Sequence, residues 1–188
     1  MVKVTVLHGS PRKNGNSDTL TNYFNKGLRS CCEVEIKDFY ANVLNIKPCQ
    51  GCLACDEPLE SWCKIQDDMQ KIYSSFIESD LIIFATPMYW GYITAQLKTI
   101  IDRMEAIANP KYFEGKNFVV IITYRYHYES TVGFFKRIQP YFKFNLDFLT
   151  CCTLDIEKDI DIPIVEIKEK LEEAFELGKE MGKRLSTI

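Results

Sequence analysis

The sequence lacks the features that would indicate nucleic-acid binding, a membrane span or acid–base catalysis by histidine. Its 23 Lys and Arg against 26 Asp and Glu give a formal charge of −3, so no excess of basic residues favours nucleic acid. Only two histidines occur among the 188 residues, and neither belongs to a visible catalytic or metal-binding triad. The longest apolar runs, such as residues 81–85 and 118–122, have the length of a strand. Because no signal peptide is seen at the N-terminus, we expect a cytoplasmic protein.

Two familiar glycine-rich phosphate loops are also missing, since the chain has neither a G-x-G-x-x-G pattern nor a Walker lysine. Instead, an alternating apolar strand at residues 2–8 leads into a polar stretch at 9–17. Apolar residues then recur at helical spacing over 20–28, so Asn16 or Ser17 is the expected N-cap of a helix. Hydroxyls, an arginine and the N-terminus of a helix together predict an anion site. A plain polar turn is the alternative.

Strand and helix signals alternate along the whole chain. We expect strands near residues 2–8, 33–39, 80–86, 116–123 and 147–154. Helices are expected near residues 17–28, 67–77, 93–104, 131–142 and 163–185. Right-handed crossovers would assemble these elements into an α/β fold with a doubly wound, five-stranded parallel sheet of order 2-1-3-4-5, and we expect one domain over residues 1–188.

This strand order brings a second loop to the edge where the polar stretch lies. Residues 86–92 follow the third strand, which Pro87 is expected to end. A planar ring system needs flat apolar walls and backbone hydrogen bonds, which the loop can supply through Pro87, Met88, Tyr89, Trp90 and Gly91. The alternative is that Tyr89 and Trp90 are only surface aromatics.

A cysteine-rich loop at about residues 46–65 carries four of the eight cysteines. Cys49, Cys52, Cys55 and Cys63 form the pattern C-x2-C-x2-C-x7-C. Such compact spacing suits a four-iron cluster, although the last gap is longer than in a ferredoxin and no proline follows Cys63. Zinc sites more often pair two separate knuckles. Thiols without metal and a zinc site remain the alternatives.

The stretches 9–17, 86–91, 96–98 and 101–103 resemble the NADPH-dependent FMN reductase family, and the cysteine stretch is most similar to the iron–sulfur flavoproteins. The resemblance covers about the first two thirds of the chain and fades after Thr123. It implies a flavodoxin-like fold, bound FMN and a homodimer or homotetramer. By position, it implies that the phosphate is held by Ser10, Arg12, Asn16, Ser17 and Thr19. The isoalloxazine would be lined by Pro87, Met88, Tyr89, Trp90 and Gly91.

One departure from the family concerns the loop after the fourth strand, where relatives commonly have a glycine-containing turn. Residues 123–128 are rich in aromatic side chains instead. They either form a wall of the active site or belong to a different kind of loop. His8, at the end of the first strand, is expected to be a buried imidazole with hydrogen-bond partners.

The resemblance implies an FMN-dependent oxidoreductase of the iron–sulfur flavoprotein kind. Such a protein would move electrons between a one-electron carrier like ferredoxin and a two-electron acceptor, through FMN and a [4Fe–4S] cluster near the same edge of the sheet or near a neighbouring subunit's flavin. No side chain is expected to act as an acid or base. The first alternative is an NAD(P)H-dependent FMN or quinone reductase without a cluster. The second is a non-catalytic flavodoxin-like electron carrier or a zinc-stabilised binding module.

Overall fold

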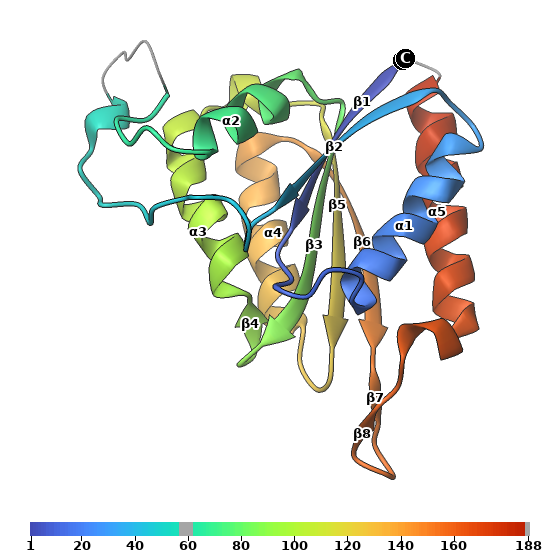
Figure 1. Ribbon diagram of the computed structural model, residues 1–188. Helices are drawn as coiled ribbons and strands as arrows, with labels where there is room; N and C mark the ends of the chain where they lie inside the picture. The colour runs from blue at the N-terminus through green and yellow to red at the C-terminus, as the bar shows by residue number, and fades with distance from the viewer. Residues whose placement is uncertain (57–61, 187–188) are drawn as a thin grey trace.

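The computed structural model describes residues 1–56 and 62–186 and contains a central parallel sheet. Its strands lie in the order β2-β1-β3-β5-β6 (Figure 1). Counted along the chain as the five main strands, this is the predicted order 2-1-3-4-5, which is therefore confirmed. The bounds are β1 (Val2–His8), β2 (Val34–Tyr40), β3 (Leu81–Tyr89), β5 (Asn117–Tyr124) and β6 (Asn145–Cys152).

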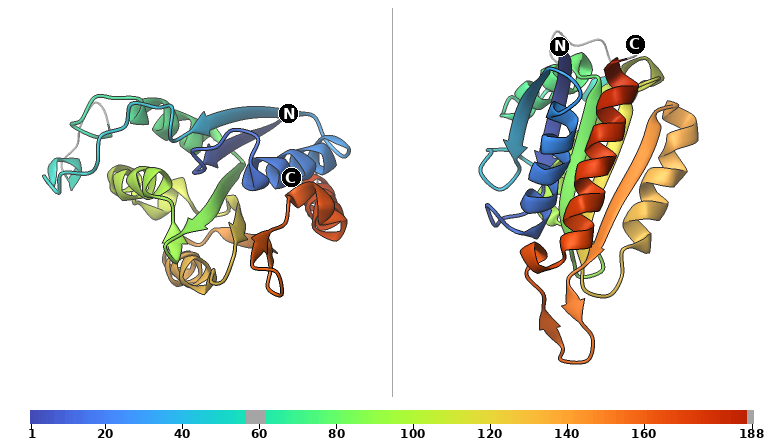
Figure 2. Two further views of the ribbon diagram at one scale, coloured as in Figure 1. Left: turned by 60° about the horizontal axis from the view of Figure 1, so that its bottom comes forward. Right: turned by 90° about the vertical axis from the view of Figure 1, so that its right-hand side faces the viewer.

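Helices cover both faces of the sheet. Figure 2 shows α1 (Asn16–Arg29) and α5 (Lys168–Ser186) side by side on one face. The other face carries α2 (Met69–Glu78), α3 (Ala95–Arg103) and α4 (Glu129–Phe142). Within the described ranges, no helix combines the length and apolar character that crossing a bilayer requires.

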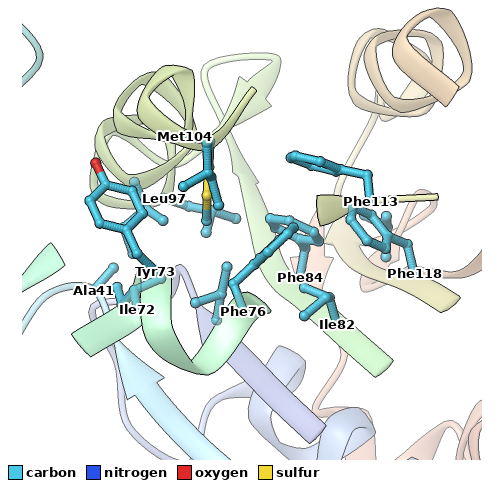
Figure 3. Close-up of a cluster of buried hydrophobic side chains, with 14 of the residues drawn as sticks. Ala41, Ile72, Tyr73, Phe76, Ile82, Phe84, Leu97, Met104, Phe113 and Phe118 are labelled. Carbon is cyan, nitrogen blue, oxygen red and sulfur yellow. The ribbon is translucent and has the colours of Figure 1, made fainter. Parts of the chain in front are cut away.

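The core consists of two apolar clusters, one on each side of the sheet. Side chains alternate along a strand, so Ile83 of β3 packs in the cluster that contains the α1 and α5 residues. Its neighbours Ile82 and Phe84 belong to the cluster on the other face, with Tyr73 and Phe76 of α2 (Figure 3). These central strands are buried on both faces, as the continuous apolar runs predict.

The structure differs from the expected elements after the third and fifth strands. Residues 147–154 do not form one strand, because β6 ends at Cys152 and is followed by a hairpin of β7 (Leu154–Asp155) and β8 (Ile160–Asp161). Pro163 does not open the last helix; the single turn η4 (Ile164–Glu166) intervenes, and α5 begins at Lys168. The reason is Ile167, whose ψ of 67° is not helical. The other short turns are η1 (Ala54–Asp56), η2 (Met104–Ile107) and η3 (Pro110–Tyr112).

Candidate functional site

The polar stretch after β1 is anchored at Gly9. The Gly9 backbone N–H donates to the Ala85 carbonyl of β3 at 2.8 Å, and its carbonyl accepts from the Thr94 hydroxyl at 2.7 Å. A Cβ at position 9 would lie 2.8 Å from the Leu97 Cβ of α3, closer than packed carbon atoms approach. Glycine therefore allows the loop to pass between β3 and the start of α3.

The rest of the loop is ordered by its own polar groups. The Ser10 hydroxyl contacts the backbone N–H and carbonyl of Arg12, each at 3.1 Å. The Asn14 N–H donates to Asp18 Oδ2 at 2.9 Å. The expected N-cap was wrong: Gly15 is the N-cap, and it has no side chain to cap the helix. The first turn of α1 thus has no N-cap side chain to accept from its N–H groups, which suits a bound anion.

His8, the last residue of β1, contacts Asp18, the residue that accepts the Asn14 N–H of this loop. Its side chain is buried, with Nδ1 3.0 Å from Asp18 Oδ1 and Nε2 2.8 Å from Asp38 Oδ1. Burial lowers the pKa of His8, but the hydrogen bonds to Asp18 and Asp38 more than offset this effect and raise the pKa above 6.5. The ring also stacks on Tyr40 at 4.2 Å between centroids. The expectation of a buried imidazole with partners is confirmed.

The loop after β3 is a short hairpin. The strand does not end at Pro87, because Pro87 still pairs with Thr123 of β5 and β3 continues to Tyr89. It then turns back through Trp90 and Gly91 into β4 (Tyr92–Ile93). Both turn residues have positive φ, 52° and 76°, as a two-residue hairpin of type I′ requires.

The loops after β1 and β3 meet at one cavity of about 520 Å³. Among the residues predicted to bind the cofactor, it is lined by Ser10, Arg12, Asn16, Ser17, Pro87, Met88 and Tyr89. Thr19, Trp90 and Gly91 are not in its lining. The Thr19 hydroxyl donates to Gly15 O one turn earlier, and the Trp90 side chain projects fully into solvent at the hairpin tip.

One wall of this cavity was not predicted from the sequence. For another, residues 123–128, the sequence left two alternatives. Tyr124, the last residue of β5, and Arg125, which follows it, line the cavity, so the start of the aromatic-rich stretch 123–128 forms a wall of the candidate site. Arg125 is fixed by Asp161 of β8, with Nε 3.3 Å from Oδ1. The missed wall consists of Thr153, Asp161, Ile162 and Pro163. The topology offers the signal that would have found it, because the residues after β6 also lie at the carboxyl edge.

The four cysteines of the predicted ligand set line a second cavity, of about 60 Å³. Cys49 and Cys52 are exposed, Cys55 is partly buried and Cys63 is buried. Burial raises the pKa of the Cys55 thiol. Residues 57–61 of the expected loop 46–65 lie outside the described residues. Across the two described ranges, no three Cys, His, Asp or Glu side chains are gathered as ligands of a single metal ion.

This second cavity lies at the far end of α3 from the first. Its wall includes Asp102 and Arg103 at the end of α3 and Glu105 and Ala106 of η2, whereas Thr94 at the start of α3 contacts the loop after β1. A helix of 9 residues is about 14 Å long. The described residues of the cysteine-rich loop, 46–56 and 62–65, which we call the cysteine segment, project to the side of the sheet in Figure 1. The expectation that both sites share one edge within a single chain is thus wrong.

The donor set of the second cavity suits an iron–sulfur cluster better than a single ion. The four thiolates of a four-iron cluster bind four separate irons, so they stand farther apart than four ligands of one zinc ion. Four thiols around one cavity fit that arrangement. The buried Arg103 also lines this cavity and forms an ion pair with Asp67.

Comparisons with known proteins found a matching family and curated relatives. A family model described as NADPH-dependent FMN reductase matches residues 2–132. An iron–sulfur flavoprotein of Methanocaldococcus jannaschii, MJ1083, is 36% identical over 104 residues, which are 54% of this chain and 51% of the relative. An iron–sulfur flavoprotein of Methanosarcina thermophila is 34% identical over 122 residues, 62% of this chain and 59% of the relative. The chain thus spans little more than half the length of these relatives.

A flavodoxin from the domain Archaea superposes with a TM-score of 0.56 at 11% identity, covering 99% of each chain, which shows the flavodoxin-like fold. An azoreductase from Bacillus anthracis superposes with a TM-score of 0.73 at 15% identity, covering 96% of this chain and 100% of the other. At that identity the likeness concerns the fold alone. The family match covers more than half of the chain and includes both loops of the larger cavity. The chain belongs to the NADPH-dependent FMN reductase family.

Proposed function

We propose that residues 1–188 act as one FMN-binding unit and form a flavin-dependent oxidoreductase. The observation that carries this proposal is the cavity of about 520 Å³ at the carboxyl edge of the sheet, where ligands of doubly wound folds bind. Ser10, Arg12 and the first turn of α1 would hold the phosphate of FMN. Pro87, Tyr89 and Tyr124 would lie along its ring. Thr19, Trp90 and Gly91, which the resemblance also implied, lie outside the lining of this cavity.

We further propose that Cys49, Cys52, Cys55 and Cys63 hold a [4Fe–4S] cluster. When bound, the cluster would supply one-electron transfer and FMN both one- and two-electron transfer. The protein would then connect a one-electron carrier such as ferredoxin with a two-electron acceptor. The names of the relatives and the cavity that the four thiols of this chain line support this proposal.

The separation of the two cavities along α3 supports assembly into a homodimer or homotetramer. In such an assembly, a cluster of one chain would approach the FMN of another. The side chains of this chain would bind, orient and shield the cofactors, and none is proposed as an acid or base.

Substitution of one exposed ligand tests the cluster. In protein purified without oxygen, we expect Cys52→Ala to lose iron and sulfide and to keep FMN, because the two cavities share no residue. The matched control is Cys31→Ala, which lies beyond the end of α1 and outside both cavities. Unchanged iron in Cys52→Ala would refute the ligand set.

A cluster-free NAD(P)H-dependent FMN or quinone reductase is the second candidate. The absence of a close trio of metal ligands among residues 1–56 and 62–186 favours it. Rapid anaerobic bleaching of the flavin by NADPH, in wild-type protein that contains no iron, would decide for this candidate. A flavin reduced only through a protein carrier would decide against it.

A further inference from the structure

Arg103 is a buried arginine that ties the cysteine segment to the fold. Its side chain is 1% exposed, as is that of its partner Asp67. Nη1 donates to Asp67 Oδ2 and to the Lys47 carbonyl, both at 2.8 Å. Nη2 donates to the Ile65 carbonyl at 3.1 Å. The two ends of the cysteine segment are therefore fastened to the end of α3 by one guanidinium.

The third nitrogen of this guanidinium, Nε, takes part in none of these hydrogen bonds. Nε is buried and has no hydrogen-bond partner in the described part of the chain. A buried N–H without an acceptor is destabilising, so the unpaired Nε–H of Arg103 calls for an explanation. Arg103 lines the cavity that Cys49, Cys52, Cys55 and Cys63 also line. The unused donor thus belongs to a residue that borders the thiol cavity.

The surroundings of Arg103 keep its charge in place. Burial disfavours the cation, but the hydrogen bond with Asp67 more than offsets burial and raises the pKa of Arg103. Tyr73 is fully buried and donates its hydroxyl to the Arg103 carbonyl at 2.7 Å. Burial raises the pKa of Tyr73, and Cys63 is near enough to act on the pKa of both residues. A permanent cation therefore stands beside the most buried of the four thiols.

We propose that Arg103 is a positioning residue for the [4Fe–4S] cluster, and that its Nε–H donates to a sulfur of the cluster or of a ligating cysteine. This inference rests on the proposed cluster. Hydrogen bonds to cluster sulfurs and nearby positive charge favour the reduced, more negative state, so they raise the reduction potential. Arg103 would both hold the two ends of the cysteine segment together and set the potential at which the cluster accepts an electron.

The Arg103→Lys variant isolates the Nε–H, because lysine has a methylene where arginine has Nε and keeps a cation to pair with Asp67. We expect the reduced cluster of this variant to be about tenfold less favoured at a given potential, which is a downward shift of 59 mV for a one-electron couple. The matched comparison is Asp67→Asn, which weakens the ion pair of the guanidinium and leaves Nε–H. Its potential should not fall below that of the wild type, because this substitution removes a negative charge beside Arg103. Redox titration followed by electron paramagnetic resonance measures both.

A second measurement is spectroscopic and detects the arginine nitrogen directly. In wild-type protein labelled with ¹⁵N-arginine, pulsed electron paramagnetic resonance of the reduced cluster should show a hyperfine coupling to nitrogen, and Arg103→Lys should lack it. An iron-containing wild type without this coupling, and with the same potential in Arg103→Lys, would overturn the role of Arg103 while leaving the cluster established. A wild type without iron would overturn the cluster itself and with it this inference.

Discussion

The loop after β1 and the cysteine segment are both polar stretches that follow a strand, yet they are held in opposite ways. The first is fastened along its length, by Gly9 to β3 and α3 and by Asp18 to the Asn14 backbone. The second is fastened at its ends by Arg103, while Cys49 and Cys52 between them are exposed. The proposed phosphate site is therefore formed before its ligand arrives, whereas the shape of the proposed thiol site depends on what the thiols bind.

Loss of the Arg103 side chain gives the largest effect expected. Arg103→Ala leaves Asp67 as an unpaired charge in a buried site, so we expect unfolding to become easier by about 3–5 kcal/mol. Urea denaturation measures this change. The control Lys98→Ala removes an exposed pair with Asp102 and should cost less than about 1 kcal/mol. Equal, small losses in the two variants would show that the cysteine segment is held by other contacts.

Added volume at Gly9 should break the preformed loop. The methyl group of Gly9→Ala would lie 2.8 Å from Leu97 Cβ and 2.9 Å from Thr94 Oγ1, which we expect to destabilise the fold by about 1–3 kcal/mol. FMN affinity, measured by fluorescence titration, should fall with it. Gly133→Ala in α4 is the control, since no atom lies within 4 Å of its added Cβ. A fall in FMN affinity in both variants would contradict the special role of Gly9.

The pH dependence of His8 gives a smaller effect. Its pKa is raised in the folded protein, so its pairing with Asp18 and Asp38 stabilises the fold fully below pH 6.5, and this contribution is lost as pH rises through the folded-state pKa. His8→Gln, which has no such titration, should therefore be less stable than the wild type at pH 6, by about 1–2 kcal/mol. The gap should narrow at pH 9. Urea denaturation at both pH values checks this, and a gap that widens with pH would contradict it.

Much of the fold followed from the sequence because the central strands are buried on both faces. Their continuous apolar runs have few alternative packings, so their order was predicted correctly. The hairpins were missed for local reasons. Trp90 is an unusual residue for a turn with positive φ, and the short β7 and β8 carry no alternating pattern.

The site could be predicted in part, where residues act next to each other in the chain. Ser10, Arg12 and Pro87 lie at the cavity as the loop positions indicated. Arg103 could not be recognised in this way, because a charged residue on a helix normally faces solvent. Its burial depends on three partners, Lys47, Ile65 and Asp67, that are distant in sequence.

The ratio of iron to FMN in wild-type protein purified without oxygen tests the central claim most directly. We predict FMN together with about four irons and four sulfides per chain. FMN without iron or sulfide would contradict the account of the cysteine segment and leave a thiol-bearing flavin reductase.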